Sequence, residues 1–172
     1  MRMGKIETDR FTLYPMTRRQ LRRIIRDPRG VSAEFGATMK PYGFIERLVK
    51  NRIYRAKLAM IDDNPAYTLL CTMWMIVDKA SGEIVGEAGF KGAPINGEVE
   101  IGYSTRTFVR GKGYMTQAVK AMCEFAFGCS GIIRVAALTK SDNLSSHRVL
   151  IKNGFVRDGF RGRYWYWYTI KK

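Results

Sequence analysis

The stretch that most constrains how this chain can fold runs from Glu98 to Ala126, where a strand pattern changes into a helix pattern across a glycine-containing loop. Residues 98–104 alternate between apolar and other side chains, which is typical of a strand with two different faces. After the loop, apolar residues recur at intervals of three and four, which predicts an amphipathic helix with one apolar stripe. The stripe consists of Met115, Ala118, Val119, Met122, Phe125 and Ala126.

The loop between these elements reads Arg110-Gly111-Lys112-Gly113-Tyr114, and we call residues 110–114 the glycine loop. A helix that starts here presents unpaired backbone N–H groups at the positive end of its dipole. Such a turn favours a phosphate or pyrophosphate ligand. The loop matches neither the Walker pattern nor G-x-G-x-x-G, since Thr116 stands where the third glycine belongs. An ordinary turn that needs two glycines is the alternative interpretation.

Two further motifs narrow the choice. The segment E-I-G-Y, followed by R-G-K-G-Y-M-T-Q-A, resembles the acetyl-CoA-binding strand, loop and helix of the GNAT acetyltransferase superfamily, in particular its RimJ/RimL-type branch. An N-x-x-S pattern at Asn143 to Ser146, a helix and then Asn153-Gly154-Phe155 resemble the second half of the same domain. Together the motifs cover most of residues 83–156.

The resemblance implies an α/β (α+β) GNAT fold in one domain over residues 1–172. It implies a mixed, mostly antiparallel central sheet of about six to seven strands, splayed between the fourth and fifth and flanked by about four helices. The residues themselves predict strands at 7–16, 67–77, 83–90, 99–104 and 132–138, and a final strand or hairpin at 160–170. The strand at 132–138 should lie parallel to the one carrying Ile101, because a helix connects them.

Three further helices are predicted. Thr17 is expected to cap a helix that runs through Asp27 and is ended by Pro28-Arg29-Gly30. Another is expected over 44–60, and the last begins at Ser141 or Asp142 and ends at Asn153-Gly154. The apolar residues of the 44–60 helix recur at helical intervals and should face the core: Phe44, Ile45, Leu48, Val49, Ile53 and Met60.

Charge is the most unusual compositional feature, because the chain carries a formal net charge of +15. Residues 1–60 hold 15 of the 30 Lys and Arg but only five acids. Such a field attracts anions, which here means CoA phosphates, an acidic protein or RNA. A solvated basic surface without a partner is the alternative.

The sequence argues against a metal site, a membrane-spanning segment and a secretory signal peptide. No apolar run is long enough to span a bilayer and residues 1–10 lack the apolar core of a signal peptide, so we expect a cytoplasmic protein. Cys71, Cys123 and Cys129 contain no C-x-x-C pair and are interpreted as free thiols. The single histidine, His147, completes no familiar zinc pattern and is predicted to be exposed and non-catalytic.

The resemblance assigns acetyl-CoA as the cosubstrate. Backbone N–H groups of the glycine loop and Met115 would bind its pyrophosphate, with Arg110 and Lys112 adding charge. The pantetheine arm would pair with the strand end and bond Asn143, while Ser146 would reach the sulfur. The predicted cosubstrate-binding residues are Tyr103, Ser104, Thr105, Arg110, Gly111, Lys112, Gly113, Tyr114, Met115, Asn143 and Ser146.

For catalysis, Glu100 is the first candidate base, directly or through a water, and Glu87 is the second. Either carboxylate could instead pair with an arginine. Related acetyltransferases use a tyrosine to protonate the leaving thiolate, and that position is Leu150 here, so Asn143 and Ser146 are the predicted alternatives. The sequence also departs from the superfamily at Phe108, where Gln or Arg is usual.

The resemblance implies an N-acetyltransferase acting on a primary amine, for instance the N-terminus of a ribosomal or other protein. An α-amine, with a pKa of about 7.7 to 8.0, is neutral more often at pH 7 than a lysine amine and so demands less of the enzyme. The alternatives are an acetyltransferase for a small amine such as an antibiotic, polyamine or amino acid, an RNA- or ribosome-binding module, and a CoA-binding domain without catalysis. The sequence leaves a monomer and a homodimer equally open.

Overall fold

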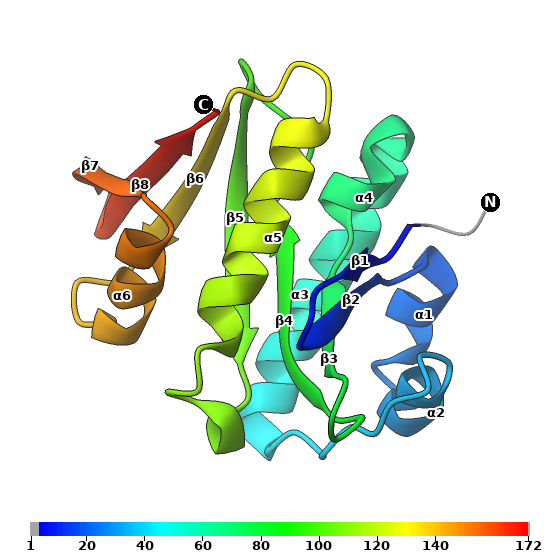
Figure 1. Cartoon of the computed structure of the whole chain (residues 1–172). Helices are drawn as coiled ribbons and strands as arrows, with labels where there is room; N and C mark the ends of the chain where they lie inside the picture. Colours follow the sequence, from blue (N-terminus) through cyan, green and yellow to red (C-terminus); the bar gives the residue numbers. More distant parts are fainter. Residues whose placement is uncertain (1–3, 172) are drawn as a thin grey trace.

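The computed structural model describes residues 4–171, which form an eight-stranded sheet with helices on both faces (Figure 1). The strand order is β1-β2-β3-β4-β5-β6-β8-β7, and only the β5–β6 pair is parallel. The strands are β1 (Ile6–Glu7), β2 (Phe11–Pro15), β3 (Trp74–Asp78), β4 (Ile84–Phe90), β5 (Glu98–Thr105), β6 (Arg134–Thr139), β7 (Val156–Arg161) and β8 (Tyr164–Ile170).

The helices outnumber the four expected. They are α1 (Arg18–Arg23), α2 (Pro28–Ala33), α3 (Phe44–Asp63), α4 (Thr68–Cys71), α5 (Tyr114–Gly128) and α6 (Leu144–Lys152), with 3-10 turns η1 (Pro65–Tyr67) and η2 (Thr107–Val109). The mixed, mostly antiparallel sheet is confirmed. It gains strands because the first predicted strand is the hairpin β1–β2 and the last is the hairpin β7–β8.

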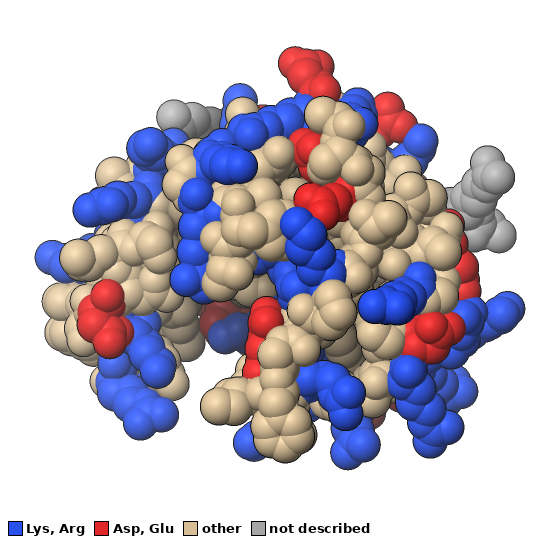
Figure 2. All heavy atoms as spheres, turned by 90° about the horizontal axis from the view of Figure 1, so that it is seen from below, with Lys and Arg blue, Asp and Glu red and all other residues tan. Residues whose placement is uncertain are grey.

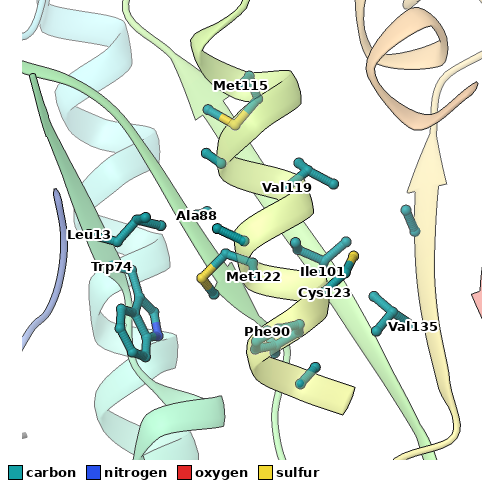
Figure 3. Close-up of a cluster of buried hydrophobic side chains, with 14 of the residues drawn as sticks. Leu13, Trp74, Ala88, Phe90, Ile101, Met115, Val119, Met122, Cys123 and Val135 are labelled. Atoms are coloured by element: carbon teal, nitrogen blue, oxygen red, sulfur yellow. The ribbon is translucent and has the colours of Figure 1, made fainter. Parts of the chain in front are cut away.

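Helix α5 buries the stripe that the sequence predicts. Met115, Ala118, Val119, Met122 and Ala126 are buried, and Phe125 is half-buried against Trp74 and Phe90. Figure 3 shows this core between α5 and the strands, with Trp74, Phe90, Ile101 and Val135 directed toward the helix. Burial of this apolar area anchors α5 and therefore fixes the glycine loop before it.

Helix α3 contradicts the prediction for its buried face. Its buried residues are Lys50, Tyr54, Lys57 and Ile61. Four of the predicted core residues are instead exposed: Phe44 at 75%, Ile45 at 76%, Leu48 at 55% and Val49 at 53%. The helix turns polar side chains inward because the sheet beneath it carries a polar cluster, described below.

The first two helices differ from the prediction at Pro28. Thr17 caps α1 with a capping box to Gln20, as its position indicates, but α1 ends at Arg23. Residues 28–30 were expected only to end a helix. They begin α2, because Asp27 accepts a hydrogen bond from the Gly30 amide at 2.8 Å and proline is favoured in a first helical turn.

The apolar run at 67–77 is a strand only in its second half. Pro65 starts η1, and Thr68 extends the helical turn into α4, its hydroxyl donating to the Pro65 carbonyl at 2.8 Å. β3 begins at Trp74, whose indole N–H donates to the Leu69 carbonyl at 3.0 Å. An apolar run alone does not distinguish a buried helical turn from a buried strand.

The sheet is splayed between β5 and β6, the two strands for which the splay is predicted. Their ladder contains only Glu98–Arg134, Val99–Val135 and Glu100–Ala136. β5 then continues to Thr105 alongside β4, while β6 continues to Thr139 alongside β8. We call the last pair, Glu100 and Ala136, the splay point. Within the described residues, every helix is too short or too polar to cross a lipid bilayer.

Candidate functional site

The glycine loop takes a conformation that favours glycine at two positions. Gly111 and Gly113 have φ values of 77° and 78°, in the left-handed region that side chains with a Cβ rarely adopt. Gly113 is the N-cap of α5, and no side chain caps this helix. The first amides of α5 are therefore available for an anion, as the sequence indicates.

Two residues far away in the chain hold the glycine loop in place. The Arg10 guanidinium donates to the Lys112 carbonyl at 2.6 Å and lies 3.7 Å above the centre of the Tyr114 ring. The Tyr114 hydroxyl in turn donates to Asp78 Oδ1 at 2.8 Å. Sequence reasoning missed Arg10 and Asp78, because no local pattern connects them to the loop.

A cavity of about 610 Å³ opens where β5 and β6 diverge, between the glycine loop and the start of α6. All of the predicted cosubstrate-binding residues line it except Lys112. Two α6 cations that the sequence analysis missed, Arg148 and Lys152, also line it. Figure 2 views the molecule from below and shows a hollow in this face with Lys and Arg gathered around it.

Tyr103 spans the cavity from β5 to α6. Its hydroxyl lies 2.7 Å from Ser146 Oγ, and burial raises the pKa of Tyr103 to about 12, so the phenol keeps its proton at neutral pH. The helix is capped by Asn143, which accepts from the Ser146 amide at 3.2 Å, rather than by Ser141 or Asp142 as expected. Leu150, at the family's tyrosine position, is fully buried.

A polar cluster lies between α3 and the sheet beside Ser104. Glu87 on β4 is the cross-strand partner of Ser104 on β5. Lys50 from α3 donates to Ser104 Oγ at 2.6 Å and lies 3.2 Å from Glu87 Oε1, which also accepts from the Tyr42 hydroxyl. The Glu87 side chain is only 2% exposed, and its Oε2 has no hydrogen-bond partner among the residues described. This cluster explains why α3 turns lysine and tyrosine inward.

Glu100, the first candidate base, lies outside this cluster and outside the first cavity. Alternation along β5 places its side chain on the same sheet face as Ser104. It forms an ion pair with Lys91 and lines a second hollow of about 460 Å³, which we call the β5–β6 hollow. Its side chain is 28% exposed. The structure therefore separates the two candidate carboxylates: Glu87 is closed in, and Glu100 is open at the splay point.

The remaining predictions concern histidine and metal. His147 was expected to be exposed, but it is half-buried, with its ring centre 5.2 Å from that of Trp167 and Nε2 3.0 Å from the Lys140 carbonyl. Among residues 4–171, no group of three or more His, Cys, Asp or Glu side chains is arranged to hold a metal ion. The three cysteines are free thiols, as interpreted from the sequence.

The profile of the acetyltransferase (GNAT) domain family matches residues 10–156. The chain belongs to the GNAT acetyltransferase family. Its similar proteins include the uncharacterised N-acetyltransferases YjdG and YoaA of Bacillus subtilis strain 168. YjdG is 37% identical over 100 residues, which are 58% of this chain and 60% of YjdG. YoaA is 29% identical over 94 residues, which are 54% of this chain and 53% of YoaA. The match thus spans less than two thirds of either relative.

Solved structures with the same fold extend over nearly the whole chain. A ribosomal-protein-S5-alanine acetyltransferase from Vibrio fischeri has a TM-score of 0.67 at 18% identity, covering 98% of this chain and 97% of that one. RimL, a ribosomal L7/L12 α-N-protein acetyltransferase solved with coenzyme A, has a TM-score of 0.67 at 17% identity, and the match covers 97% of this chain and 98% of RimL. The aminoglycoside acetyltransferase AAC(6')-Ib, also solved with coenzyme A, has a TM-score of 0.63 at 18% identity, and the match covers 94% of this chain and 95% of that one. At this identity the likeness establishes the GNAT fold.

Proposed function

We propose that this GNAT protein is an acetyl-CoA-dependent N-acetyltransferase that acetylates a primary amine in a ternary complex, with a polypeptide α-amine as the favoured acceptor. One observation carries the proposal: the uncapped start of α5 opens into a cavity between two diverging strands. An anion-binding helix end and an open sheet edge together suit a ligand with a diphosphate at one end and an amide-containing arm at the other.

The residues present fit coenzyme A. The amides of Gly113, Tyr114 and Met115 would hold the diphosphate, with Arg110, Arg148 and Lys152 as cations at the cavity wall. The backbone of Tyr103 to Thr105, which β6 leaves unpaired, would bond the pantetheine amides. The cosubstrate supplies an activated acetyl thioester. A backbone N–H near Thr105 would stabilise the negative charge that develops on its carbonyl oxygen.

Glu100 is the proposed acceptor of the amine proton, directly or through a water. It stands at the splay point on the face away from α5, and it is accessible, unlike Glu87. In the reaction the amine nitrogen forms a bond to the acetyl carbon, the carbon–sulfur bond breaks, and the amine proton moves to Glu100. Glu87 holds Lys50 against Ser104 and so positions the strand end.

The thiolate that leaves must receive a proton or a hydrogen bond. Leu150 cannot supply either, whereas Ser146 and Tyr103 form a hydroxyl pair at the cavity wall. We propose that Ser146 donates a hydrogen bond to the sulfur and accepts one from the Tyr103 hydroxyl in turn. Burial raises the pKa of Tyr103 to about 12, so its hydroxyl keeps its proton and remains a hydrogen-bond donor over the neutral range.

The fold does not choose the acceptor, since its neighbours include enzymes named for ribosomal proteins and for aminoglycosides. The α-amine is favoured because more of it is neutral at pH 7. Mass spectrometry of peptides, aminoglycosides, polyamines and amino acids incubated with the protein and acetyl-CoA tests this choice. We expect acetylation of peptide N-termini, lowered about 100-fold or more by Glu100→Gln at unchanged CoA affinity. Exclusive acetylation of small amines would contradict the α-amine assignment.

A further inference from the structure

The β5–β6 hollow carries charges that the proposed chemistry does not use. Besides Glu100 and Lys91, it is lined by Glu98 from β5, Arg134 from β6 and Arg161 from the β7–β8 hairpin. Three cations therefore face two carboxylates, which leaves one positive charge in excess. The hollow begins at the splay point, so it adjoins the place where an acceptor amine would lie under the proposed function.

The two arginines are positioned but only loosely paired. Both approach the single carboxylate of Glu98, Arg134 at 3.6 Å and Arg161 at 3.5 Å, and the Tyr166 hydroxyl donates to the same carboxylate at 2.6 Å. A well-formed ion pair of this kind is about 2.7 to 2.9 Å long. Each guanidinium offers five N–H donors, so most of them remain available to a further acceptor.

Aromatic rings fix the planes of both guanidinium groups. Arg134 lies 4.6 Å from the ring centre of Tyr168, and Arg161 lies 3.8 Å from that of Tyr166. These contacts hold the arginine heads against β8, so their geometry does not depend on Glu98 alone. A planar group held in this way is suited to a carboxylate, which it can bind through two parallel hydrogen bonds.

The spacing along β5 sets the size of the acceptor. Glu98 and Glu100 are two residues apart on one face, which corresponds to about 7 Å. Because both arginines lie against the Glu98 carboxylate, an amine delivered to Glu100 lies roughly 7 to 10 Å from them, which is about two to three extended residues. A peptide whose second or third residue is acidic covers that distance.

We propose that the β5–β6 hollow is a specificity subsite, in which Arg134 and Arg161 bind the carboxylate of an acidic residue at position two or three of the acceptor polypeptide. The inference rests on the proposed function and names its substrate class. This proposal assigns the binding of an acidic acceptor to the β5–β6 hollow, and not to the basic first third of the chain. There, Arg18 pairs with Asp62 and Arg23 with Asp27 and Glu34, on helices at the far end of the sheet from β6 (Figure 1).

The test uses peptides that are identical except for Asp, Asn or Lys at the second residue, and a second set varied at the third. The wild-type protein should acetylate the better Asp peptide with a kcat/KM at least about tenfold above its Asn counterpart, and further above the Lys peptide, mainly through KM. Arg161→Met and Arg134→Met should each reduce that ratio severalfold. Calorimetry on the CoA-saturated protein should show the same loss in Asp-peptide affinity.

Arg163→Met is the matched control, because Arg163 lies in the same hairpin outside the hollow and contacts only the Tyr164 ring and hydroxyl in the described structure. It should keep the wild-type ratio. Equal turnover of Asp and Asn peptides by the wild type, or a ratio unchanged in both arginine variants, would overturn the subsite while leaving the acetyltransferase intact. Failure to acetylate any amine despite CoA binding would instead overturn the proposed function.

Discussion

Helices α5 and α3 cover opposite faces of one sheet and differ in the kind of side chain that they bury. α5 buries its apolar stripe, including Val119 and Met122, both fully buried. α3 is longer and buries Lys50, Tyr54 and Lys57, while Phe44 and Ile45 at its start are exposed. A hydrophobic pattern therefore predicts the buried face of a helix only where the surface beneath it is itself apolar.

The difference follows from what each face of the sheet contains. Under α5 the sheet contributes a continuous apolar core that runs from Leu13 to Val135 (Figure 3). Under α3 it contributes apolar side chains such as Met73 and Met75, but also the Glu87 carboxylate, which would be costly to cover with apolar side chains. The acceptor is also proposed to bind on the face that α3 covers. Polar side chains needed for the reaction therefore occupy positions there that apolar side chains would otherwise fill.

The largest effect on this comparison is expected from Lys50→Met. Removing the ammonium leaves Glu87 buried without its cation, which typically destabilises a protein by about 3 to 5 kcal/mol. Urea denaturation measures the loss, and Glu87→Gln combined with Lys50→Met should recover much of it. A loss below about 1 kcal/mol would show that α3 does not depend on its polar contacts.

On the opposite face, Met122→Ala should cost somewhat less. The side chain is fully buried in the α5 core, and large-to-small changes of this kind cost about 2 to 5 kcal/mol. The same denaturation experiment applies, with Ala substitution of exposed Glu124 on the same helix as the control. Retained stability in Met122→Ala would indicate that the stripe is not the anchor of α5.

Lys57 makes the stability of the α3 face depend on pH. Burial lowers its pKa to about 8 from an ordinary 10.5, so between these values the unfolded chain holds the proton more tightly than the folded one. The contribution of Lys57 to stability should therefore rise with pH from about 8 to about 10.5, by at most about 3 kcal/mol, whereas buried Cys123, whose pKa is raised, contributes in the opposite direction. Denaturation curves of the wild type and Lys57→Met across this range test it, and the difference in stability between the two proteins should shift in favour of the wild type as the pH rises. Parallel pH profiles in both proteins would count against it.

The smallest effect is expected at the exposed start of α3. Leu48→Ala removes a side chain that is 55% exposed and should change stability by no more than about 0.5 kcal/mol. The periodic pattern, which places Leu48 in the core, predicts a loss several times larger. This variant therefore decides directly between the pattern and the structure.

Sequence analysis succeeded where the determining interactions are local. The glycine loop, the α5 stripe and the parallel crossover to β6 each depend on residues close together in the chain, and each was predicted. The contacts that support the site were not: Arg10 reaches Lys112 across 102 positions, and Tyr42 reaches Glu87 across 45. No local sequence motif marks an isolated arginine or tyrosine as part of such a contact. These residues meet only because the folded sheet brings distant parts of the chain together.

The central claim is that the N-terminus of α5 binds the diphosphate of coenzyme A. Isothermal titration of CoA tests it most directly, with Gly113→Val set against Gly131→Val, whose glycine has the same φ of 78° in the turn after α5. Both changes impose similar backbone strain, but only the first alters the glycine loop. We predict micromolar affinity for the wild type and Gly131→Val, and at least about tenfold weaker binding for Gly113→Val. Equal affinity in all three proteins, or no binding by the wild type, would contradict the claim.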